Sequence, residues 1–86
     1  MDPKEFFGMT GSQVIEEMRK KGYRITKQRK LIVDIIMNNE FTSCKEIYYR
    51  VIKEDPTIGM ATVYRMINQL EEMNVIRRIE RIEVVR

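Results

Sequence analysis

With 86 residues, 43% of them hydrophobic, the chain is long enough for one folded domain with a small core, and its composition argues against intrinsic disorder. One cysteine and no histidine exclude an internal disulfide and the usual Cys/His zinc sites, fit a reducing cytoplasm, and leave acid–base catalysis without its commonest residue. The net charge of +3 indicates little by itself, and no signal peptide or membrane-spanning apolar run is visible.

Residues 1–11 are expected to form an N-terminal arm ahead of a single domain over residues 12–86. Pro3 and Gly8 discourage a long helix in the arm. The arm also carries two adjacent aromatic residues, Phe6 and Phe7, which could dock on a partner. Packing of the arm against its own domain is the simpler interpretation.

The first helix is predicted to begin between Thr10 and Ser12 and to end near Gly22. Thr10 and Gln13 fit a capping box, in which each side chain accepts a hydrogen bond from a backbone N–H group, and Ser12 is a rival cap. Gly22 suits the left-handed residue that follows a helix. Seven positive residues and no acid lie between positions 19 and 30, so the positive charge is concentrated in this part of the chain.

A second helix is predicted from Thr26, as N-cap, to Asn38 or Asn39. Its first turn holds only basic residues and a glutamine, which opposes the helix dipole and suggests an anion at that end. The helical spacing of apolar residues predicts a buried face made of Leu31, Ile32, Ile35 and Ile36.

A third helix is predicted to start at Ser43, where Ser43 and Glu46 fit another capping box, and to end before Pro56. Cys44 lies in its first turn, where the pKa of a thiol can fall. A redox role for Cys44 is therefore conceivable, but a small buried side chain without chemistry is the commoner use of a free cysteine.

The fourth helix, capped by Gly59, is predicted to carry the functional surface. One side of this helix is apolar, and the other side holds Ala61, Tyr64, Arg65 and Asn68 with no acid before Glu71. Acids are normally favoured at a helix start, so their absence is explained by a phosphate or a base edge that binds there. Because a short turn separates this helix from the third, the pair predicts a helix-turn-helix with a DNA recognition helix.

Beyond Asn74, which can end a helix in the left-handed conformation, residues 75–86 are rich in β-branched and charged residues. They predict one strand, or a hairpin that turns near Ile79 to Arg81, although no glycine marks the turn. A basic hairpin after a recognition helix would be a wing. The predicted fold class is therefore mainly α, a winged helix-turn-helix with four helices followed by a short β-hairpin wing.

Six segments of the chain have a characteristic sequence and spacing. They are Gly22–Arg29 (GYRITKQR), Glu46–Tyr48 (EIY), Asp55–Pro56, Ile58–Arg65 (IGMATVYR), Leu70–Glu72 (LEE) and Val75–Arg78 (VIRR). Together they resemble the N-terminal DNA-binding domain of the ferric uptake regulator family, over roughly residues 12–80. The resemblance implies a winged-helix repressor domain that binds A/T-rich, palindromic operators in double-stranded DNA as a dimer.

The same resemblance implies roles for individual residues. Tyr64 and Arg65 would enter the major groove, Tyr64 touching a thymine methyl group or a phosphate and Arg65 reading a base edge or binding phosphate. Lys21 would reach toward the minor groove, and Thr62 and Arg29 would contact phosphates. With the open helix side and the other basic residues included, the expected DNA-binding residues are Lys21, Lys27, Arg29, Lys30, Ala61, Thr62, Tyr64, Arg65, Asn68, Arg77 and Arg78.

The chain also departs from the family pattern. Family members continue into a C-terminal dimerisation domain with metal ligands, whereas this chain stops at Arg86, so that half is expected to be absent. The family often has a metal-binding histidine before the third helix, and Phe41 occupies the matching position. No cofactor is therefore expected within the chain. A homodimer would form on DNA, through the arm or through the missing half, and the chain would be either a fragment or a stand-alone reader.

Two other function classes are weighed against DNA binding. Winged helices also serve as protein-docking modules, and seven methionines with the Phe6–Phe7 arm could form an apolar surface. DNA binding weakens steeply with salt and apolar docking does not, which separates the two. An enzyme is the weakest class, because Cys44 lacks a histidine partner and the acids are scattered. Arg65 could also have a purely structural use, by pairing with Glu72 or with another nearby acid.

Overall fold

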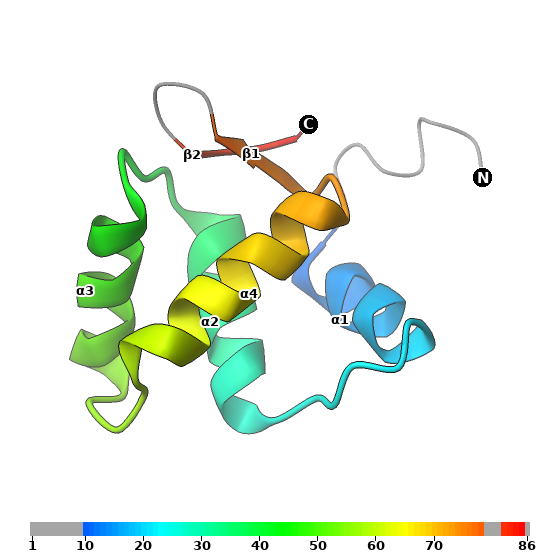
Figure 1. Ribbon diagram of the computed structural model, residues 1–86, viewed down its shortest axis with the longest axis horizontal. Coiled ribbons are helices and arrows are strands. Elements are labelled where there is room, and N and C mark those ends of the chain that lie inside the picture. The colour runs from blue at the N-terminus through cyan, green and yellow to red at the C-terminus, as the bar shows by residue number, and fades with distance from the viewer. Residues whose placement is uncertain (1–9, 79–81, 86) are drawn as a thin grey trace.

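The computed structural model describes residues 10–78 and 82–85 (Figure 1). The elements are, in chain order, α1 (Gly11–Lys20), α2 (Lys27–Asn38), α3 (Cys44–Glu54), α4 (Met60–Glu72), β1 (Ile76–Arg78) and β2 (Ile82–Val84). This order confirms the predicted winged helix-turn-helix. The predictions that concern the Phe6–Phe7 arm, the turn of the hairpin and the Arg78 side chain lie outside the described part. Within that part, no helix combines the length and the apolar character needed to cross a membrane.

Local capping fixes the ends of α1 and α2 much as predicted. Thr10, not Ser12, caps α1, and both hydrogen bonds of its capping box with Gln13 are present. Thr26 caps α2 by accepting a hydrogen bond from the Arg29 N–H at 3.2 Å. Gly22 has a φ of +89°, the left-handed conformation expected after α1.

The start of α3 differs from the prediction in one hydrogen bond. The Ser43 hydroxyl accepts from the Glu46 N–H at 3.2 Å, as expected for an N-cap. The Glu46 carboxylate does not return to Ser43 but accepts from the N–H of Thr42 at 2.8 Å and from the Thr42 hydroxyl. These two hydrogen bonds from Thr42 lower the pKa of Glu46. Ser43 therefore remains the N-cap, and only the reciprocal hydrogen bond to Glu46 is displaced, from the N–H of Ser43 to that of Thr42.

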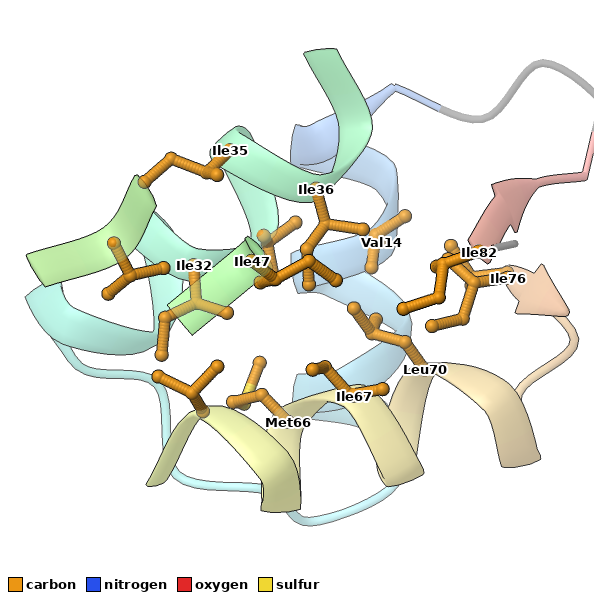
Figure 2. Close-up of a cluster of buried hydrophobic side chains, with 14 of the residues drawn as sticks. Val14, Ile32, Ile35, Ile36, Ile47, Met66, Ile67, Leu70, Ile76 and Ile82 are labelled. Carbon is orange, nitrogen blue, oxygen red and sulfur yellow. The ribbon is translucent and has the colours of Figure 1, made fainter. Parts of the chain in front are cut away.

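The core lies where α2 packs against the three other helices (Figure 2). Leu31 was expected in the buried face of α2 but is only half-buried, whereas Val33 is fully buried. Val33 is buried because α1 approaches this side of α2 closely. A Cβ atom at Gly11 would lie 4.0 Å from Val33 Cγ1 and 2.9 Å from Asp34 Oδ1. Burial therefore extends around α2 beyond a single face.

The wing is an antiparallel hairpin in which Ile76 pairs with Val84 and Arg78 pairs with Ile82. It is also attached to the connection between α2 and α3, because the Ile82 N–H donates to the Phe41 carbonyl at 3.0 Å. The Phe41 side chain is only 3% exposed and belongs to the core together with Ile76 and Ile82. The wing is thus packed onto the domain beside the C-terminal end of α4.

Candidate nucleic-acid interface

The open side of α4 is polar and accessible. Ala61, Arg65 and Asn68 are exposed, and Thr62 and Tyr64 are half-buried. The opposite side is closed, since Val63, Met66, Ile67 and Leu70 are at most 1% exposed. In Figure 1, α4 crosses in front of α2, so the helix covers the core with one side and leaves the other side uncovered. This division of the helix is the one that its sequence predicts.

Arg65 is not neutralised by the acid considered in the sequence. Arg65 and Glu72 form no ion pair with each other, although both side chains belong to the described part of the chain. The Arg65 guanidinium projects from an exposed position, with five N–H donors in a planar fork. Such a fork suits recognition of a base edge or a phosphate.

The N-terminal end of α4 is electropositive. Its N-cap is Gly59, which has no side chain to accept hydrogen bonds from the free N–H groups of the first turn. That turn also holds no acid. The nearest preceding acid, Asp55, already accepts hydrogen bonds from the N–H of Thr57 at 3.0 Å and from the Thr57 hydroxyl. Those hydrogen bonds lower the pKa of the Asp55 carboxyl. The helix end can therefore attract an anionic group.

The start of α2 lies beside the turn that leads into α4. Gln28 Nε2 donates to the Thr57 hydroxyl at 3.4 Å, which joins the first turn of α2 to that turn. The first turn of α2 also contains no acid, and its Lys27 and Lys30 are exposed. The starts of α2 and α4 are therefore close together, and neither first turn holds an acid.

The basic segment between residues 19 and 30 divides into paired and exposed cations. Arg19 pairs with Glu16 at 2.5 Å and Lys20 pairs with Glu17 at 3.4 Å, so both are partly neutralised within α1. Lys21, at the end of α1, is exposed. The unpaired positive charge of this segment is therefore smaller than its seven basic residues suggest.

Arg29 has a structural use that its sequence position did not reveal. Its Nη1 donates to the Arg24 carbonyl at 2.8 Å, and the residue is half-buried. This hydrogen bond ties α2 to the loop that follows α1. Arg29 therefore holds the loop between α1 and α2 against the first turn of α2.

The wing contributes one described cation to the surface. Arg77 on β1 is exposed and lies opposite Glu83 in the hairpin. Its neighbour Arg78 pairs with Ile82 through the backbone, and its side chain lies outside the described part. The expected DNA-binding residues thus come from α4, from the α1–α2 region and from the wing.

The side chains of the described residues do not form a metal site. The position that the family often gives to a histidine holds Phe41, whose ring is buried in the core and has no ligand atom. Within residues 10–78 and 82–85, no group of three or more His, Cys, Asp or Glu side chains is placed to hold a metal ion. Cys44 is half-buried and packs against the core, as a small filling side chain would.

Two residues that sequence reasoning did not assign lie at this surface. Gln28 connects α2 to the turn before α4, which only the three-dimensional arrangement reveals. Met60, the first residue of α4, is 46% exposed. In the sequence, Met60 could have been noticed as a large apolar residue at the border between the two sides of the helix.

Comparison with known proteins places the chain in a family. The model of the "Ferric uptake regulator family" matches residues 20–84. The ferric uptake regulation protein of Brucella suis biovar 1 (strain 1330) is 41% identical over 64 residues, which cover 73% of this chain and 45% of that protein. The protein of the same name from Bacillus subtilis (strain 168) is 32% identical over 69 residues, 78% of this chain and 46% of that protein. The chain spans somewhat less than half the length of these relatives.

Solved structures give the same result. A manganese uptake regulator superposes with a TM-score of 0.74 at 30% identity, covering 90% of this chain and 60% of that chain. The ferric uptake regulator of Helicobacter pylori, described as having three functional metal binding sites, gives a TM-score of 0.73 at 26% identity, covering 88% of this chain and 58% of that chain.

Proposed function

The chain belongs to the ferric uptake regulator family, and we propose that it binds double-stranded DNA sequence-specifically and represses transcription from an A/T-rich, palindromic operator. The observation that carries this proposal is the open side of α4. There, the exposed Ala61 and Arg65 follow a helix start that has no acid and no capping side chain. A stable helix in isolation does not require that arrangement, whereas a helix that enters the major groove uses it.

Phosphate contacts come from cations around α4. Lys21, Lys27 and Lys30 are exposed, and the wing adds Arg77 and Arg78. Ammonium and guanidinium groups bind the DNA backbone without regard to sequence, and they set the position and orientation of the domain on the duplex. Thr62 and the remaining N–H donors of Arg29 supply further phosphate contacts.

Base contacts come from α4 itself. Arg65 donates to a base edge in the major groove, and Asn68 has the amide that suits adenine N6 and N7. Tyr64, one turn after Met60, touches a thymine methyl group or a phosphate. Ala61 allows the helix start to approach the bases closely. This division of labour makes binding sequence-specific although most of the charge on the surface is not.

Two copies of the domain bind one operator. A single winged helix offers a small interface, and a two-fold site doubles the number of contacts. The palindromic operator therefore fits two chains, each placing its α4 in one half-site. The chains are joined by the DNA, by the N-terminal arm, or by a C-terminal dimerisation domain of the kind that the family has.

The test begins with selection of a preferred duplex from a randomised library by the 86-residue chain. Fluorescence anisotropy then compares that duplex with a scrambled duplex over a salt series. We expect steep salt dependence, preference for the selected duplex, and loss of that preference in the Tyr64→Ala/Arg65→Ala double variant. Lys45→Ala is the matched control, because it removes one exposed charge from the first turn of α3. That turn is at the opposite end of α3 from the turn into α4.

The other outcomes are equally informative. Equal, salt-sensitive binding to both duplexes would contradict sequence-specific reading and leave a non-specific DNA-binding domain. Absence of binding at low salt would contradict DNA binding altogether and favour a protein-docking module.

A further inference from the structure

Met60 differs from every other large apolar residue of α4. It is 46% exposed, whereas Val63, Met66, Ile67 and Leu70 are buried in the core. Within the described residues, the only comparably exposed large apolar side chain is Tyr49, on α3. A single exposed apolar residue is common on protein surfaces. The position of Met60, rather than its exposure alone, requires an explanation.

Met60 lies at the end of α4 that the proposed function directs into the major groove. It is the first helical residue, and it sits between Gly59 and Ala61, which have little or no side chain. A Cβ atom at Gly59 would meet nothing within 4 Å, so the helix start projects into open space. The first residues of α4 therefore carry no charged side chain, and Met60 is the one large side chain at this accessible tip.

The helical spacing aligns Met60 with a residue already assigned to base reading. Met60 and Tyr64 are four residues apart, so they lie one above the other on the same side of the helix. Ala61, Arg65 and Asn68 form the adjacent row. Met60 thus extends the Tyr64 row by one turn toward the tip.

The chemistry of the side chain restricts what it can recognise. A thioether has no hydrogen-bond donor and is a weak acceptor, so the side chain of Met60 cannot bind a phosphate. The thymine C5-methyl group is the apolar feature that base pairs present in the major groove. An unbranched, polarisable side chain adapts well to such a group.

We propose that Met60 is a specificity-determining residue that packs against the C5-methyl group of a thymine in each half-site. This inference rests on the proposed function, because it requires α4 to lie in the major groove. It adds an apolar contact to the polar contacts of Arg65 and Asn68, and it favours thymine over cytosine at the position that Met60 faces.

The experiment is a double-substitution cycle between the protein and the DNA. The selected duplex is synthesised with single thymines replaced by deoxyuridine, which removes only the C5-methyl group. Wild type should bind the duplex with the critical deoxyuridine about fourfold more weakly per half-site, as expected for burial of one methyl group. Met60→Ala should weaken binding to the thymine duplex at least as much, and deoxyuridine should then cause no further loss.

Two controls make the cycle decisive. Met60→Gln keeps the length of the side chain but not its apolar character, so it should lose the same sensitivity to the methyl group. Tyr49→Ala removes the other exposed large apolar side chain, on α3, and should retain the full deoxyuridine effect. Circular dichroism melting should show that Met60→Ala and Met60→Gln fold like wild type, because the residue is exposed.

Each remaining outcome overturns the inference. If the losses from Met60→Ala and from deoxyuridine multiply at every thymine, the two groups do not touch and the inference is wrong, while the proposed function stands. If Met60→Ala binds like wild type, the same conclusion follows. If wild type shows no preference among duplexes, the proposed function fails and the inference fails with it.

Discussion

Arg65 is the side chain whose removal best separates base reading from phosphate binding. It is exposed on α4 and does not pair with Glu72. We expect Arg65→Ala to cost about 1–3 kcal/mol of binding free energy on the selected duplex and to relax specificity at one base position. Anisotropy on that duplex and on its single-base variants measures both effects.

Lys27→Ala is the matched comparison for Arg65→Ala. Lys27 is an exposed cation in the first turn of α2. Its removal should weaken binding to all duplexes about equally and reduce the salt slope by about 1, because a phosphate contact carries no sequence information. Unchanged affinity in both variants would show that the assigned surface does not face the DNA.

Asp55 gives the turn before α4 a dependence on pH. Hydrogen bonds from the Thr57 hydroxyl and N–H hold the pKa of Asp55 below its ordinary value of 3.8. A carboxyl group whose pKa is lower in the folded state stabilises the fold above its unfolded pKa, and this stabilisation is lost as the pH falls through the folded value. We expect Asp55→Asn to melt below wild type at neutral pH, and the difference to shrink in acid below 3.8.

Thermal melts of wild type and Asp55→Asn across this range test the prediction. Comparing the two proteins cancels the titration of the other acids. A melting difference that is constant from neutral pH to acid would mean that the turn does not depend on the charge of Asp55.

At the scale of elements, the wing depends on Phe41. The Phe41 ring is buried with Ile76 and Ile82, and its carbonyl accepts from the Ile82 N–H at 3.0 Å. Phe41→Ala leaves a cavity under the hairpin and should lower the free energy of unfolding by about 3–5 kcal/mol, whereas Phe41→Leu should cost less. Urea denaturation measures this loss. Hydrogen exchange at the Ile82 amide reports whether the hairpin separates before the helices unfold.

A loss below about 1 kcal/mol in Phe41→Ala would contradict this role, since surface substitutions typically stay within that range. The prediction also has a consequence for the position before α3. Because a packed phenyl ring occupies it, the wing of this chain is positioned by apolar contacts and a backbone hydrogen bond. The Phe41 side chain has no atom that could bind a metal, so it positions the wing by packing alone.

The sequence predicted the elements whose boundaries depend on neighbouring residues. Thr10, Thr26 and Gly59 were recognised as helix starts because capping involves residues three or four positions apart. The burial of Phe41 depends on Ile82, which lies on the other side of two helices in the sequence. The burial of Val33 depends on how closely α1 approaches α2. No periodicity within one helix contains either piece of information.

In the candidate site too, features that belong to one element could be predicted from the sequence, whereas contacts between elements could not. The open side of α4 could be read from a helical wheel, because its residues belong to one element. The contact between Gln28 and Thr57, and the hydrogen bond from Arg29 to the Arg24 carbonyl, required the arrangement of α2 against its neighbours. Met60 was missed since a position at the border of a helix side becomes informative only when its exposure is known.

At the scale of the whole molecule, the distribution of exposed cations predicts the salt dependence of binding. The exposed cations of the described part that are assigned to phosphates are Lys21, Lys27, Lys30 and Arg77. If these four groups each neutralise one phosphate, the slope of log K against log salt should be about −4 for one chain. A duplex that carries one half-site should show this slope and bind one chain.

The full palindrome should bind two chains, and the slope for the overall reaction should then be about −7, close to twice the half-site value. Anisotropy titrations at several salt concentrations give the slopes, and light scattering of the complexes gives the stoichiometry. Equal slopes with one chain on each duplex would contradict two-fold binding by this chain. A slope near zero on both duplexes would contradict phosphate contacts, because counterion release accompanies every such contact. The ratio of the two slopes therefore tests the number of chains independently of which bases α4 reads.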